Sequence, residues 1–192
     1  MTKSDYQLII LTQIVFYVLH MPTNFFWVTE VGVFIGEYTG IFTLLQTAIL
    51  TISSIVLMRY FWFKRLFFPL IAVIILDSLQ VTHILYLLSV VDSWLVENNF
   101  YMILYWAMIL ANLTFAGSLI TINGSKWLNV HGYIHIVTIL MTLAEIFGLL
   151  HPVFVSTLWI INSFFFIYHF IQERSNLGKV LPLRENEEVL DL

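Results

Sequence analysis

Two histidines and a glutamate lie in the stretch HGYIHIVTILMTLAE, which runs from His131 to Glu145 and is otherwise largely apolar. On a helix with 100° per residue, five side chains fall within about 40° of one line: His131, His135, Thr138, Thr142 and Glu145. This stripe is about 21 Å long at 1.5 Å per residue. Because imidazole titrates near neutral pH and a neighbouring carboxylate can shift it, the stripe predicts a proton relay or one wall of a polar path. The alternative is interhelical hydrogen bonding that only holds helices together.

Several other apolar segments carry polar side chains at a similar depth. Counting from the expected segment ends places these residues near the middle: Gln46, Asp77, Gln80, Asn112, Thr138, Thr142 and Asn162. Asp77 is the most costly of them, because a carboxylate in hydrocarbon must be neutral, paired or hydrated. The pattern predicts a polar belt near the midplane. Asp77 at this depth and Glu145 near the external end of its span are the groups expected to carry charge.

The histidines also allow a haem or metal site. Haem b in membrane bundles is held by histidine pairs from neighbouring helices. The candidate haem or metal ligands are His20, His83, His131, His135 and His169. His131 and His135 present two nitrogens on one helix face, but the residues between them lack the glutamate of an HExxH site. No cofactor is predicted for the transport hypothesis, and haem b belongs to the alternative.

Composition sets the class of protein in which these side chains must work. Of the 192 residues, 60% are hydrophobic and only 10% are charged, which predicts an all-α membrane protein with lipid as its main surroundings. The absence of cysteine excludes thiolate metal sites and a cysteine nucleophile. The net charge of −4 and the absence of a basic patch argue against nucleic-acid binding. No G-x-S-x-G motif is present, so an enzyme is not favoured.

Apolar runs and their breaks predict a six-transmembrane-helix bundle within residues 1–174. The expected spans are 5–22, 37–59, 66–91, 99–122, 127–150 and 152–172. The segment 23–36 is too short to cross a bilayer and is expected to lie at the interface or to form a re-entrant turn. Residues 175–192 are expected to form an acidic tail that is either solvated or a docking segment for a cytoplasmic protein.

The positions of the basic residues predict the orientation of the bundle. With six spans, all eight Lys and Arg residues fall on one side: Lys3, Arg59, Lys64, Arg65, Lys126, Arg174, Lys179 and Arg184. Basic residues accumulate on the cytoplasmic side of membrane proteins, so both termini are expected to be cytoplasmic.

These observations favour a channel or transporter that moves protons, a small cation or a small polar solute. In this hypothesis Asp77 and Glu145 carry charge, His131 and His135 form a relay or gate, and the amide side chains at the middle coordinate the solute. A homo-oligomer is also compatible with so small a chain. Two alternatives stay open: a haem-b electron-transfer protein, and a non-catalytic membrane subunit or signalling effector that acts through residues 175–192.

Overall fold

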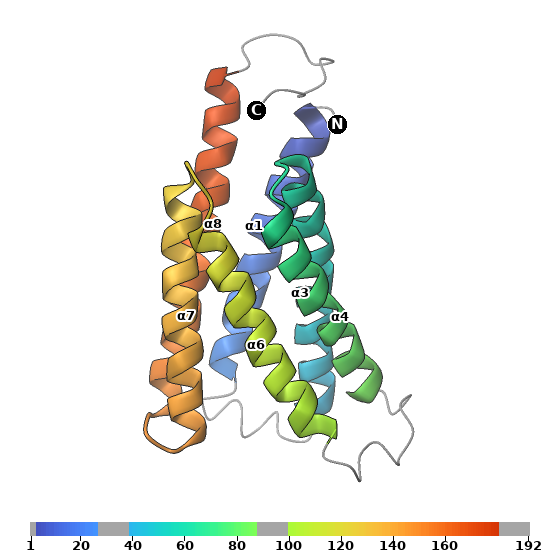
Figure 1. The fold of residues 1–192 in the computed structure, drawn as a ribbon, viewed down its shortest axis with the longest axis vertical. Coiled ribbons are helices and arrows are strands. Elements are labelled where there is room, and N and C mark those ends of the chain that lie inside the picture. The colour runs from blue at the N-terminus through green and yellow to red at the C-terminus, as the bar shows by residue number, and fades with distance from the viewer. Residues whose placement is uncertain (1–2, 27–38, 88–99, 181–192) are drawn as a thin grey trace.

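The computed structural model describes residues 3–26, 39–87 and 100–180, and Figure 1 shows them as a bundle of long helices. The helices are α1 (Lys3–Phe26), α3 (Thr39–Phe63), α4 (Phe67–Leu87), α6 (Phe100–Ile120), α7 (Lys126–Ile146) and α8 (Pro152–Val180). These described ranges contain no strand. The predicted all-α class is therefore confirmed for this part of the chain.

Five of the helices contain stretches that are long and apolar enough to cross a membrane. The stretches are Leu44–Phe63, Phe67–Leu85, Met102–Ile120, Lys126–Ile146 and Pro152–Asn176. Large apolar side chains such as Ile103, Leu110 and Phe164 are exposed on the outside of the bundle, where lipid would cover them. The chain thus has the features of a multi-pass membrane protein, while a sixth crossing by α1 and the side on which the termini lie stay predictions.

The helix ends differ from the predicted span ends at a few places. Helix α1 continues to Phe26, past the break expected at Pro22. Helices in membranes tolerate proline, because neighbouring helices and side chains can satisfy the backbone groups that it leaves unpaired. Residues 27–38, most of the expected interfacial segment, lie outside the described residues. Helix α8 continues to Val180 and so includes the first residues of the expected tail, and residues 181–192 lie outside the described part.

The six helices form a closed ring. Each helix packs against the next one along the chain, and α8 packs against α1 to close the ring. Figure 1 shows that α1 begins and α8 ends at the same end of the bundle, beside the α3–α4 and α6–α7 turns. Arg65 and Lys126 lie at or beside these two turns. We call this the basic end, and the end that carries the α7–α8 turn the far end.

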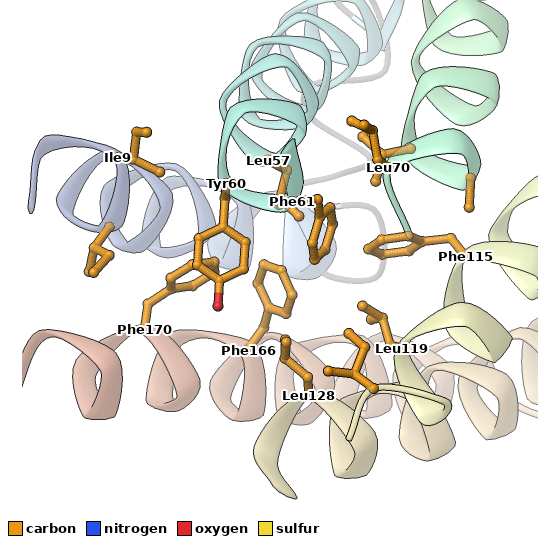
Figure 2. Close-up of a cluster of buried hydrophobic side chains, with 14 of the residues drawn as sticks. Ile9, Leu57, Tyr60, Phe61, Leu70, Phe115, Leu119, Leu128, Phe166 and Phe170 are labelled. Carbon is orange, nitrogen blue, oxygen red and sulfur yellow. The ribbon is translucent and has the colours of Figure 1, made fainter. Parts of the chain in front are cut away.

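The hydrophobic core fills the half of the bundle near the basic end. Figure 2 shows aromatic and aliphatic side chains from several helices meeting there, among them Phe61 of α3, Phe115 of α6 and Phe166 of α8. Phe61, Phe166 and Phe170 are completely buried. Interiors packed in this way leave few voids larger than a water molecule, so this half of the bundle is closed.

Candidate functional site

A pocket of about 300 Å³ lies inside the ring of helices. All six helices contribute to its wall: Tyr17 and His20 (α1), Gln46, Leu50, Ser53, Ser54 and Leu57 (α3), Val73, Leu76 and Gln80 (α4), Met108, Asn112 and Phe115 (α6), His131 and His135 (α7), and Trp159, Asn162 and Ser163 (α8). Its volume is at the lower end of the range for small-molecule sites. We call it the central pocket.

The central pocket begins where the hydrophobic core ends. Leu57, Val73 and Phe115 belong to both, so the core forms the wall of the pocket on the side of the basic end. The polar lining residues lie farther from the basic end along their helices, as His20 does in α1 and Gln46 does in α3. Polar groups therefore gather in the part of the bundle that the apolar side chains leave open.

A continuous chain of hydrogen bonds crosses the pocket wall from α6 through α7 to α8. Asn112 Nδ2 donates to the Met108 carbonyl oxygen (2.8 Å), and Asn112 Oδ1 lies 3.3 Å from His135 Nε2. Asn162 Nδ2 lies 3.0 Å from His135 Nδ1. His131 Nδ1 lies 3.1 Å from the backbone oxygen of Asn162. Three helices are thus joined through two imidazoles and two amides.

The donors and acceptors in this hydrogen-bond network determine which ring nitrogen of each histidine carries the proton. An amide Nδ2 can only donate, so His135 Nδ1 must accept from Asn162, and His135 Nε2–H donates to Asn112 Oδ1. A carbonyl oxygen can only accept, so His131 must donate from Nδ1. The network therefore requires a neutral His135 and, when His131 is also neutral, leaves a lone pair on His131 Nε2.

Close packing of α6 against α7 positions both histidines. Gly132 follows His131 directly, and a Cβ atom built on Gly132 would lie 2.7 Å from the Ala116 backbone oxygen and 2.9 Å from a side-chain carbon of Ile120. A glycine is therefore needed at this point of α7 for the observed approach. Phe115 and Trp159 then pack edge-on against the His135 ring, at centroid distances of 6.1 and 5.2 Å.

The structure brings some of the predicted site residues together and leaves others outside. The predicted residues that line the central pocket are Gln46, Gln80, Asn112, His131, His135 and Asn162, and the candidate ligand His20 joins them. Asp77 and Glu145 are not among the lining residues of this pocket. His83 and His169 are also not among them.

The two threonines of the predicted stripe lie beside the pocket. Thr138 is fully buried, and its hydroxyl donates to the Ile134 carbonyl oxygen in its own helix. Thr142 accepts a hydrogen bond from Trp159 Nε1 (3.2 Å) and lines a second pocket of about 140 Å³. This second pocket shares Met108, Asn112 and Trp159 with the central pocket and extends toward the far end.

A polar cluster at the basic end was not predicted from the sequence. Tyr6 of α1 donates to Glu173 Oε2 of α8 (2.7 Å), and Lys64 Nζ lies 3.2 Å from the same oxygen. The arrangement joins the first and last helices to the α3–α4 turn. The only signal in the sequence was that Glu173 directly follows the expected span 152–172, on the same side of the bundle as the basic loop that contains Lys64. The pairing itself could not be predicted, because it depends on which helices become neighbours.

His169 belongs to this end of the bundle and not to the central pocket. Tyr60 Oη lies 2.9 Å from its Nε2, and Ser125 Oγ lies 3.5 Å from its Nδ1. Both ring nitrogens therefore have protein partners. In the described ranges no three His, Cys, Asp or Glu residues are grouped so that they could hold a metal ion.

Comparisons with protein-family models, with curated proteins and with solved structures find no match to this chain. Function is therefore inferred from the geometry of the central pocket.

Proposed function

We propose that this chain is a membrane transporter that binds a small polar solute in the central pocket and carries it across the bilayer. The observation that carries the proposal is the pocket itself, because all six helices contribute to it and each of them contributes at least one polar side chain. Hydrogen bonding between helices requires only pairs of polar groups, whereas here the groups surround a volume large enough for a solute.

The packing at the basic end favours a carrier over an open channel. The hydrophobic core closes the bundle between the pocket and the basic end, while the second pocket extends from it toward the far end. A carrier exposes its site to one side at a time by moving helices against one another. The closed core and the pocket on its other side correspond to one such state.

The chemistry of the pocket wall favours an uncharged solute. The described lining residues include no Asp, Glu, Lys or Arg, and the hydrogen-bond network requires a neutral His135. A charged solute would lose its hydration on entering the pocket and would meet no opposite charge among these lining residues. This is costly in a bilayer interior. We therefore propose that Asp77 and Glu145 are not required for flux, in contrast to the role expected for them from the sequence.

Solute uptake by reconstituted protein tests this function. Proteoliposomes are mixed rapidly with urea or glycerol, and their volume change is followed by light scattering. We expect flux above that of protein-free liposomes, and a decrease of about tenfold in His135→Phe, which removes hydrogen bonds that align the wall. Thr138→Val is the matched control, because this buried threonine lies on the same helix but bonds only within it.

Four further results would count against parts of the proposal. Absence of solute flux with folded wild-type protein would contradict transport. Loss of flux in Asp77→Asn or Glu145→Gln would show that charged groups are required after all. A Soret absorption band in the purified protein would favour the haem-b alternative, and loss of a cellular function on deleting 175–192 in a protein without flux would favour the effector alternative.

A further inference from the structure

Two fully buried side-chain atoms of the central pocket have no hydrogen-bond partner: His131 Nε2 and Asn162 Oδ1. Both residues are almost completely inaccessible, with 1% of His131 and 2% of Asn162 exposed. A buried polar atom without a partner costs about 1–3 kcal/mol, so such atoms in a pocket indicate a ligand that supplies the missing bond.

The two atoms offer the same kind of interaction. Asn162 Oδ1 is a carbonyl oxygen and accepts hydrogen bonds only. His131 donates from Nδ1 to the Asn162 backbone oxygen, so in the neutral ring Nε2 carries a lone pair and also accepts. The same hydrogen bond holds the two residues side by side. Both residues belong to the pocket lining, so the wall contains two buried acceptors without partners.

We propose that the central pocket contains a binding site for an uncharged solute with at least two N–H or O–H donors, which bond to His131 Nε2 and Asn162 Oδ1. This inference rests on the proposed function and specifies the class of solute. An amide, a urea or a polyol meets the description. A solute without donors would leave both acceptors unsatisfied. An ammonium ion would meet no carboxylate among the described lining residues.

Histidine nitrogen resonances provide a direct test of this site. The full chain is labelled with ¹⁵N-histidine, placed in lipid nanodiscs and titrated with urea, with acetone or with methylammonium. Urea and acetone have nearly the same shape, but only urea has N–H donors. His131→Phe assigns the His131 resonances, because phenylalanine retains the ring and removes both nitrogens.

We expect urea to shift the His131 Nε2 resonance in a saturable manner, because a lone pair that accepts a hydrogen bond is less deshielded. Acetone and methylammonium should leave it in place. Removal of either acceptor, in His131→Phe or Asn162→Leu, should weaken urea binding by about tenfold, while Thr138→Val should bind urea as the wild type does. If His131→Phe does not fold, Asn162→Leu still removes one acceptor and retains every histidine.

An Nε2 resonance that urea does not move would overturn the inference and indicate that water alone occupies the site. An equal shift with acetone, or preferential binding of methylammonium, would also overturn it. The outcome is separable from that of the flux measurement. Saturable urea binding without flux would contradict transport and retain the site, whereas flux with an unmoved resonance would retain transport and place its route elsewhere.

Discussion

At the scale of single residues, His135 links the helices that form the pocket wall. It accepts from Asn162 of α8 at Nδ1 and donates to Asn112 of α6 at Nε2. Hydrogen bonds between membrane helices contribute modestly, about 0.6 kcal/mol on average, because the unfolded chain in the membrane also finds partners. Their main effect here is on geometry, since each bond restricts the orientation of one imidazole ring.

A double-mutant cycle between His135→Phe and Asn112→Leu measures this link. We expect a coupling of about 0.6–1.7 kcal/mol in the free energy of unfolding, determined in detergent micelles. The control cycle pairs His135→Phe with Thr157→Val, an exposed residue whose hydroxyl bonds within its own helix, and should give no coupling. Equal values in the two cycles would show that the bond is absent in the folded protein.

At the scale of helices, the approach of α6 to α7 depends on one glycine. A Cβ atom added at Gly132 would clash with Ala116 and Ile120. A Cβ atom added at Gly117 of α6 would have nothing within 4 Å. The two glycines therefore differ in role although the sequence offers no means of telling them apart. Gly132 matters for the site because His131 and His135 lie on the same helix within one turn of it.

Alanine substitution distinguishes the two positions. Gly132→Ala should lower the free energy of unfolding by about 1–3 kcal/mol, because a methyl group is forced into a packed interface. Gly117→Ala should leave stability unchanged or raise it by up to about 1 kcal/mol, because alanine has the higher helix propensity. Thermal or denaturant unfolding of both variants in the same detergent is the measurement. Equal stabilities would contradict the close approach of the two helices.

At the scale of the whole molecule, the ring is closed at its basic end by Tyr6, Lys64 and Glu173. Lys64 lies 3.2 Å from Glu173 and 5.4 Å from the centroid of the Tyr6 ring, so one ammonium group contacts both the first and the last helix. The same end carries Arg65 and Lys126 beside the turns. Because basic residues are retained in the cytoplasm, we expect this end to face the cytoplasm.

Labelling of single cysteines tests this orientation, and the absence of native cysteine makes each label specific. Asn123→Cys is exposed in the α6–α7 turn, and Leu149→Cys is exposed in the α7–α8 turn. In intact cells a membrane-impermeant maleimide should react with Leu149→Cys at once, and with Asn123→Cys only after permeabilisation. The reverse pattern would invert the orientation, and equal reactivity of both sites in intact cells would contradict a crossing by α7.

The sequence by itself determined the helical class and most helix positions, because apolar length is a local property. From the position of each residue along its helix it also predicted the depth of the polar side chains. It therefore predicted that Asn112 and Asn162 lie at one level, and that His131 and His135 belong to one stripe of a single helix. Only the tertiary structure decided which of them share a pocket, because the rotation of a helix and its choice of neighbours depend on the packing of the whole ring. For that reason Asp77, which the sequence placed at the same depth as Gln80, does not line the pocket, and His169 bonds to Tyr60 at the basic end.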